Sequence, residues 1–359
     1  MTEPPMIHTV PPPPPPDGRM PASNRFVGVL NVLGVYILVA ALFAIGPLVS
    51  PAKFLTELNL LSALQSVALM GIVAMGVAFI TYSRHYVDLS IPGIMAISGV
   101  VAVWALKFGF AASMLAGLAA GAAVGVVNGL VVGYLRLNPI IWTLAVASVL
   151  SGLIRWVYSG QQLYPDERTS AGWEFLNLYN CQILGKPLLP AIVLVVAAVA
   201  AYLLMHHTAY GASLKLTGSN YEAARLSGIP VRRVVGLTFV ISSVTSAAAG
   251  ILLTSFNKVG AEYVGKGYDF MAVTAVVLGG MTLAGGRGNV IGVLGGVIAI
   301  ALMTNVMSLM RIPPLHIGPW AFGEITIGTF WQNIIQGAIF ILVVGINSLS
   351  LRKAGRDDS

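Results

Sequence analysis

Residue types that commonly carry chemistry are few in this chain, and their spacing predicts no catalytic centre. The five histidines and the single cysteine, Cys181, never stand at a metal-ligand spacing with carboxylates, and neither GxSxG nor HExxH occurs. One cysteine allows no internal disulfide and no cysteine-based zinc or iron site. We therefore expect no catalytic residues, no bound metal and no cofactor.

A loop that could hold a nucleotide is also missing from the sequence. The loop GxxxxGK[ST] grips phosphates with its backbone amides and its lysine, and its hydroxyl binds magnesium. The Gly-Lys pairs at 185–186 and 265–266 are followed by Pro187 and Gly267, which carry no hydroxyl. We therefore expect that the chain is not an enzyme and that any ATP hydrolysis takes place in a separate subunit.

The polar segment 206–233, HHTAYGASLKLTGSNYEAARLSGIPVRR, is the most informative stretch. Tyr221–Leu226 is a good helix former, either residue of the pair 219–220 can cap its first turn, and Gly228 stops it. Glu222 lies favourably near the positive amino end of this helix. The helix is either a connector on the membrane face or a docking knob for a cytoplasmic partner, and the composition leaves both interpretations open.

The elements that position these residues are membrane helices. Of the 359 residues, 57% are hydrophobic and only 9% are charged, whereas about 25% are charged in an ordinary soluble domain. So few charged side chains cannot form the polar surface of a soluble domain. One membrane crossing needs about 20 apolar residues. The sequence therefore predicts an all-α polytopic membrane protein. We expect about ten transmembrane helices, at 26–49, 58–80, 91–108, 111–135, 139–158, 188–205, 234–256, 268–284, 289–310 and 326–348.

Two of these stretches, 91–108 and 268–284, are short. Both contain internal glycines and adjoin polar segments. A helix of this kind is typical of a broken or partly re-entrant span that its neighbours bury.

Glycines recur at helical spacing in two other stretches. They stand every four positions, at 117, 121, 125 and 129 in one span and at 288, 292 and 296 in another. This spacing places a stripe of small residues on one helix face and predicts close helix packing. We favour a contact inside one subunit over a role at a dimer interface or in a pathway.

The chain divides into a proline-rich tail over 1–25, one membrane domain over 26–350 and a short tail over 351–359. The first tail has the composition of a disordered or polyproline II segment. Counting basic residues places 12 of the 20 on the side of the amino terminus, 7 on the other side and Arg155 within a span. Both termini are therefore predicted to be cytoplasmic. The scattered basic residues form no stripe for a nucleic acid.

Ionisable groups are nearly absent from the predicted spans. Carriers driven by ion gradients usually keep such groups there. Only Arg155 falls inside a span, with Asp88 and Asp269 at span edges. Coupling to an ion gradient is therefore disfavoured, although a stand-alone secondary carrier or facilitator for a small polar solute stays the alternative function.

Polar side chains within spans or at their ends are the candidates for lining a translocation pathway. Each of them has a structural alternative, because such side chains often bond a neighbouring helix or their own backbone. For Asp88 this alternative is a cap on the helix that Pro92 begins. The candidates are Asp88, Ser90, Asn128, Asn138, Thr143 and Asn305.

Three blocks of the sequence resemble one family. The block GSNYEAARLSGI (218–229) is similar to the cytoplasmic coupling loop of ribose-type sugar permeases of ATP-binding-cassette (ABC) importers. The block VVLGGMTLAGGRGNVIGVLGG (276–296) resembles a second family segment, and VDLSIPGIMAISG (87–99) a third. Where family members place Gly-Gly-Ile before Asp-Leu-Ser, this chain has the bulkier residues 84–87. The segment 311–325 has no match, and the resemblance covers roughly 58–348.

The resemblance implies an ABC importer permease fold and a subunit that forms the pathway for a sugar or related polyol in the bacterial inner membrane. Its implied partners are ABC ATPase subunits, a periplasmic solute-binding protein, a second permease copy or paralogue and membrane lipid. The solute itself is not readable from these residues. The residues that the resemblance assigns to ATPase coupling are Gly218, Asn220, Glu222, Ala223, Ala224, Arg225, Ser227 and Gly228.

Overall fold

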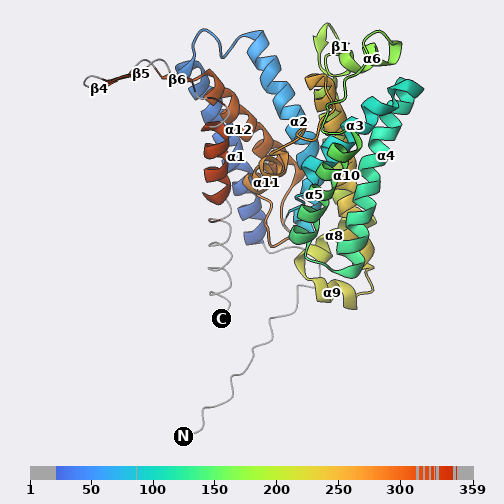
Figure 1. Ribbon diagram of the computed structural model, residues 1–359. Helices are drawn as coiled ribbons and strands as arrows, with labels where there is room; N and C mark the ends of the chain where they lie inside the picture. The colour runs from blue at the N-terminus through green and yellow to red at the C-terminus, as the bar shows by residue number, and fades with distance from the viewer. Residues whose placement is uncertain are drawn as a thin grey trace.

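The computed structural model describes residues 22–85, 87–312, 315–317, 320–322, 325–326, 328, 331–342 and 345. The first helices are α1 (Ala22–Val49), α2 (Glu57–Tyr82), α3 (Ile91–Ala105), α4 (Phe110–Leu130), α5 (Pro139–Val157), α6 (Ser170–Leu178) and α7 (Leu189–His207). They are followed by α8 (Ala209–Ser219), α9 (Tyr221–Leu226), α10 (Val231–Asn257), α11 (Tyr268–Leu278), α12 (Val290–Leu309) and a helix over Trp331–Leu342. The long helices run roughly parallel to one another (Figure 1).

Among the described residues, eight helices are long and apolar enough to cross a membrane, and two shorter apolar helices, α11 and Trp331–Leu342, accompany them. These ten helices correspond to the ten predicted stretches. At 1.5 Å per residue, α11 is about 16 Å long, roughly half of the hydrocarbon thickness. The short eighth span is therefore confirmed. The predicted tails lie outside the described residues, except that α1 already begins at Ala22, inside the tail expected over 1–25.

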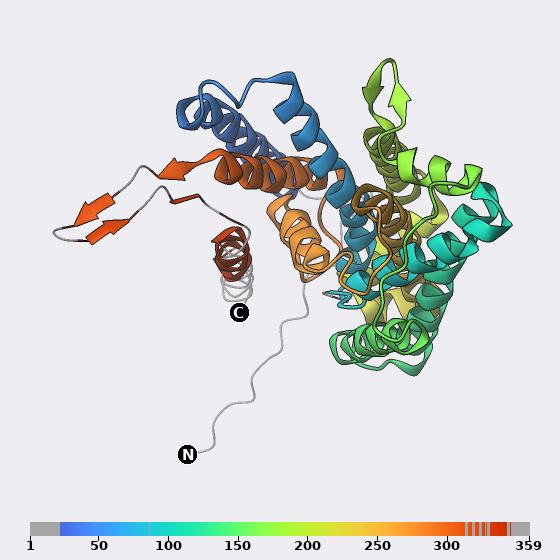
Figure 2. The same cartoon turned by 45° about the horizontal axis from the view of Figure 1, so that its top comes forward.

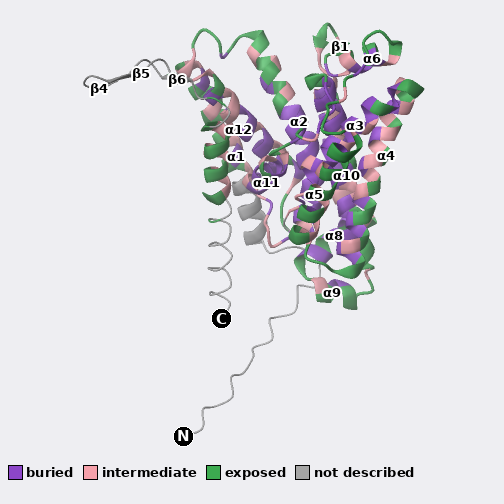
Figure 3. Ribbon diagram, in the orientation of Figure 1, coloured by how far each residue is buried: buried purple, intermediate pink, exposed green. Residues whose placement is uncertain are grey.

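The core of the bundle is built around α2 and α10. Helix α10 packs against α2, α3 and α4, and α12 packs against α1, α2 and α11. The buried residues gather in α2, α3, α10 and α12, whereas α1, α5 and α7 present mostly exposed apolar side chains (Figure 3). The outer helices therefore carry the surface that lipid would cover.

The glycine stripe of α4 forms the closest helix contacts of this core. A methyl group added at Gly121 would lie closer than 3.0 Å to Ala247 of α10 and to Ser98 of α3, and one at Gly129 would meet the backbone of Gly236. On the other side of the bundle, Gly292 and Gly279 join α12 to α11 in the same way. The predicted contact inside one subunit is thus confirmed.

Substituting alanine for Gly129 should destabilise the protein by about 1–3 kcal/mol, as overpacking of a close contact usually does. The reason is that the added carbon would lie against the carbonyl of Gly236, and two helix backbones would have to separate. Gly34→Ala is the matched control, because nothing lies within 4 Å of its added carbon. Thermal unfolding in detergent measures both, and equal midpoints for the two variants would contradict the expectation.

Two local features depart from the sequence expectation. Within 206–233 the sequence predicted only the helix Tyr221–Leu226, but 209–219 also form a helix, α8, whose Leu214 is buried and whose Tyr210 stacks on Phe79 of α2. The predicted helix 111–135 ends in a π-helical turn (η2) over Val131–Leu135, after which Arg136 adopts a left-handed backbone.

Short elements lie at the end of the bundle opposite α9 (Figures 1 and 2). They are α6, the hairpin β1 (Gln182–Ile183) with β2 (Lys186–Pro187), and the strands β3 (Arg311–Ile312), β4 (Leu315–Ile317), β5 (Trp320–Phe322) and β6 (Ile325–Thr326). Helix α6 and the β1–β2 hairpin stand over the helices, and β4 and β5 extend sideways from them (Figures 1 and 2). Strand β3 pairs antiparallel with β6, and β4 with β5. The Ser255 hydroxyl of α10 donates to the carbonyl of Phe175 and accepts from the amide of Tyr179, which fixes α6 to the bundle.

The intramembrane arginine predicted from sequence has a partner. Arg155 lies near the last turn of α5 and forms an ion pair with Glu262, in the segment before α11. On the same end of the bundle, Lys186 of the hairpin pairs with Glu57, the first residue of α2, at 2.6 Å. Both pairs join loop segments to helices at the end opposite α9.

Candidate functional site

Helix α9 is a six-residue helix at the end of the bundle (Figure 1). The Asn220 side chain caps it by accepting a hydrogen bond from the amide of Ala223, at 3.0 Å. At the other end Gly228 has a φ of +77° and the amide of Ile229 donates to the carbonyl of Ala224. This pattern is a Schellman motif. Capping at both ends explains why so short a helix ends where the sequence predicts.

The two faces of α9 differ in exposure. Ala224 is buried among Ile80 of α2, Val132 of η2 and Val235 of α10. The opposite face carries Glu222 and Arg225, which form an exposed ion pair at 3.1 Å. Leu226, an unusual residue for a solvent face, is 82% exposed. The predicted coupling residues thus separate into a set that builds the helix and a pair, Glu222 and Arg225, that is free to contact a partner.

A glycine junction ties α9 to two distant parts of the chain. We use this name for the contact of Gly218 and Ser219, at the end of α8, with Gly285–Gly286 and with Tyr82, the last residue of α2. The amide of Gly286 donates to the carbonyl of Tyr82 at 2.9 Å. An added carbon at Gly218 would lie closer than 3.0 Å to both of these backbone groups. Two of the sequence blocks that pointed to one family therefore touch each other in space.

Four of the six pathway candidates come together in the interior as one polar network. The Asn128 amide of α4 donates to the Ser90 hydroxyl at 2.8 Å and accepts from the Trp142 indole at 2.9 Å. Asp88 accepts from both the amide and the hydroxyl of Ser90. The Thr143 hydroxyl accepts from the amide of Leu89 at 2.9 Å. The network joins the start of α3 to α4 and α5, and Asp88, Ser90, Asn128 and Thr143 are fully buried.

The two remaining candidates lie apart from this network. Asn138 caps α5, with its side-chain oxygen accepting from the amides of Ile140 and Ile141. Asn305 of α12 exchanges two hydrogen bonds with Asn59 of α2, at 2.8 and 3.1 Å. The structure therefore gives all six candidates a hydrogen-bonded structural role.

The amino-acid sequence was compared with known proteins. Residues 59–344 match the family described as branched-chain amino acid transport system / permease component. The chain is 32% identical over 322 residues to the ribose import permease protein RbsC of Bacillus subtilis, covering 89% of this chain and 94% of that protein. It is 31% identical to the L-arabinose transport system permease protein AraH of Escherichia coli (91% and 93% covered) and 27% identical to its xylose permease XylH (93% and 97%).

The chain belongs to this family of ABC transporter permeases. It is a multi-pass membrane protein and supplies the membrane-spanning permease component of an importer. The matched range includes α9, the glycine junction and the polar network, so the features built above all belong to the part of the permease that relatives share.

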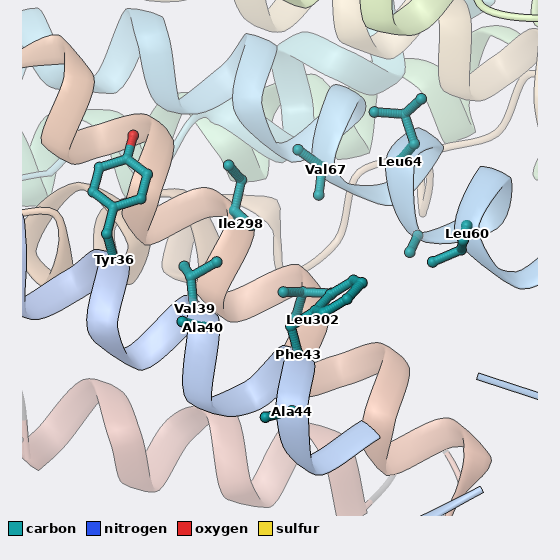
Figure 4. A pocket seen from close by; sticks show the side chains of 11 residues that line it. Tyr36, Val39, Ala40, Phe43, Ala44, Leu60, Leu64, Val67, Ile298 and Leu302 are labelled. Atoms are coloured by element: carbon teal, nitrogen blue, oxygen red, sulfur yellow. The ribbon is translucent and has the colours of Figure 1, made fainter. Parts of the chain in front are cut away.

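An apolar groove of about 510 Å³ lies on the side of the permease between α1, α2 and α12 (Figure 4). Its lining includes Val39, Phe43, Leu64 and Leu302, and its one polar group is the hydroxyl of Tyr36. That hydroxyl already donates to the carbonyl of Ile291. A polar solute needs hydrogen-bonding partners, which this groove lacks.

We expect Asn128→Leu to destabilise the permease by about 2 kcal/mol. The substitution leaves the Trp142 indole N–H without its acceptor and Ser90 without its donor, and a buried unpaired group costs about 1–3 kcal/mol. Asn138→Ala removes an exposed cap on α5 and should cost about 1 kcal/mol. Denaturant unfolding followed by tryptophan fluorescence compares the two. A wild-type midpoint for Asn128→Leu would mean that the network contributes nothing to stability.

Several features of the candidate site carried no sequence signal of their own. Leu226 was one apolar residue in a short helix, and only its exposure singles it out. The glycine junction joins the end of α8 to residues 285–286, which lie far along the chain beyond α10 and α11. Trp142, which completes the polar network, looked like one more apolar residue of a span.

Proposed function

We propose that this permease carries a sugar or related polyol into the cell, driven by separate ABC ATPase subunits that engage α9. The observation that carries the proposal is that α9 is capped, buried on one face and exposed on the other. It is therefore a fixed helix with one face available for docking and not a mobile connector. The relatives supply the solute class, since they are named as permeases for ribose, L-arabinose and xylose.

The proposal places the α9 end in the cytoplasm, as the count of basic residues predicts. A periplasmic solute-binding protein would then meet the opposite end, where α6 and the β1–β2 hairpin lie. A second permease copy or a paralogue would complete the membrane channel. The chain then lies in the bacterial inner membrane with both termini in the cytoplasm.

Motion of α9 has a direct route to the pathway candidates. Ala224 belongs to the same buried cluster as Ile80 of α2 and Val132 of η2, and η2 continues α4, which carries Asn128. When an ATPase dimer closes and shifts α9, α4 and α2 move with it, and the polar network between α3, α4 and α5 changes its packing. Separation of these helices would expose Asp88, Ser90, Asn128 and Thr143 to a passing solute. Weak polar contacts of this kind suit a pathway that must also release the solute.

Reconstitution in liposomes tests the proposal. The permease is combined with candidate ATPase subunits and a candidate binding protein from the same organism, and uptake of labelled ribose, arabinose, xylose and leucine is measured with and without ATP. We expect ATP-dependent uptake of one of the sugars, or its competition by a polyol, and none of leucine. ATP-independent uptake driven by a proton or sodium gradient would instead establish the stand-alone carrier. Leucine uptake would show that the solute is an amino acid, which the wording of the matched family allows.

A further inference from the structure

A cationic cavity of about 250 Å³ lies at the α9 end, between α9, the first turn of α10 and the turn that joins η2 to α5. We call it the arginine cavity. Its polar lining comes from His85, Arg136, Asn138, Tyr221 and Arg232. At about 30 Å³ per water molecule in the liquid, this volume equals roughly eight waters and can hold a phosphate group.

The positive charge of the arginine cavity is not neutralised within the described part of the permease. The ion pairs found there involve Arg155, Lys186 and Arg225, and none involves Arg136 or Arg232. The Arg136 guanidinium lies 5.6 Å from the centre of the Tyr221 ring, a cation–π contact that leaves its charge in place. Two arginines from different elements thus face one space.

His85 adds a hydrogen-bonding group but no charge at neutral pH. Burial lowers the pKa of His85 below its usual value, because desolvation disfavours the imidazolium. Its Nδ1 lies 2.9 Å from the carbonyl of Ser83. The charge of the cavity therefore resides on the arginines.

The surroundings of the cavity indicate the source of the anion. Leu135, Leu137 and Ile141, which flank Arg136 along the chain, are 68%, 47% and 70% exposed. They lie where α4 and η2 end and α5 begins, at the end of two predicted membrane spans. An anionic phospholipid matches such a site at a membrane boundary. Its headgroup phosphate needs the cationic cavity, and its acyl chains need the exposed apolar side chains beside the cavity. A free phosphate ion would need only the arginines.

We propose that the arginine cavity binds the headgroup phosphate of an anionic phospholipid between Arg136 and Arg232. The acyl chains then lie along Leu135, Leu137 and Ile141, toward the bilayer. The site goes beyond the proposed transport function and does not depend on it. Because Tyr221 belongs to α9, a bound lipid also links the docking helix to the adjacent leaflet.

The test measures binding of phosphatidylglycerol to the full-length permease in detergent, by native mass spectrometry across a lipid titration. An arginine near an anionic lipid surface contributes about 1 kcal/mol, which corresponds to about a fivefold change in affinity. We therefore expect Arg136→Gln and Arg232→Gln each to weaken phosphatidylglycerol binding about fivefold. Arg233→Gln is the matched control, since it removes an exposed neighbouring charge that does not line the cavity, and it should change binding less than about twofold.

Three outcomes would overturn the proposal. Equal losses in all three variants would indicate attraction by general surface charge, and displacement of the lipid by millimolar inorganic phosphate would assign the cavity to a free anion. Unchanged lipid binding in Arg136→Gln and Arg232→Gln would show that the arginine cavity does not hold the headgroup. Because the measurement follows lipid on the isolated permease, its result is independent of whether the permease carries a sugar.

Discussion

Leu226→Asp should weaken binding of the ATPase subunits by about tenfold or more while the permease stays folded. Leu226 is 82% exposed on α9, so the free permease tolerates a carboxylate there. In the complex that carboxylate would be taken out of water at an interface, and a loss of 1.4 kcal/mol already corresponds to tenfold. The measurement is the affinity of purified ATPase subunits for the permease in nanodiscs, with the thermal unfolding midpoint as the test of folding.

Leu184→Asp is the control for this experiment. Leu184 is 92% exposed on the β1–β2 hairpin at the opposite end of the bundle, so the same charge is added far from α9. Its affinity for the ATPase subunits should equal that of the wild type. If the two aspartate variants bind equally well, α9 is a connector and the docking interpretation is wrong.

Other substitutions on α9 differ in how clearly they report docking. Glu222→Arg replaces an exposed ion pair with two neighbouring cations and should also weaken docking without unfolding the permease. Gly228→Trp is a poorer probe, because the φ of +77° at Gly228 strains any other side chain. A loss of docking in that variant would combine backbone strain with steric hindrance.

Gly218→Ala should destabilise the permease by about 1–3 kcal/mol, the usual range for overpacking a tight contact. The added carbon would lie closer than 3.0 Å to the carbonyl of Tyr82 and 2.6 Å from the amide nitrogen of Gly286. Both are backbone atoms, so no side-chain rotation relieves the contact. The glycine junction must open, and α9 loses its support from α2 and from the loop after α11. We therefore expect a lower unfolding midpoint together with reduced ATP-dependent transport.

Gly152→Ala is the matched substitution for this second prediction. Gly152 lies within α5 with nothing inside 4 Å of an added carbon. Alanine is favoured over glycine in a helix by about 0.5–1 kcal/mol, so this variant should be as stable as the wild type or slightly more stable. Equal stability of Gly218→Ala and Gly152→Ala would mean that the glycine junction is loose.

The number and place of the membrane helices were predictable because the lipid hydrocarbon requires a long apolar run for every crossing. A span needs a long apolar run whatever its neighbours are, and the ten runs in the sequence correspond to the eight long and two short apolar helices. Helix α8 was missed, since its glycines and polar residues favour a loop locally. It is helical because Leu214 and Tyr210 pack against the bundle, which is tertiary information.

The candidate site was predictable to a different degree. The boundaries of α9 followed from local signals, a cap at 219 or 220 and the stop at Gly228, and the structure has the cap at Asn220 and the stop at Gly228. The sequence also named Asp88, Ser90, Asn128 and Thr143 as polar residues of the spans. That these four meet while Asn305 pairs elsewhere depends on how helices distant in sequence pack, which composition does not encode.

The glycine junction also has a consequence for the order of events at the ribosome. Helix α9 is synthesised well before Gly285 and Gly286, which abut the residues just ahead of it. A nascent chain that has reached only α10 can form the caps of α9. It still lacks Gly285 and Gly286, whose contacts fix the residues before α9 to the end of α2. In the proposed docking, ATPase subunits would therefore find α9 fully supported only after about four fifths of the polypeptide has been made (286 of 359 residues). Truncated products that end before that point would present α9 without this support.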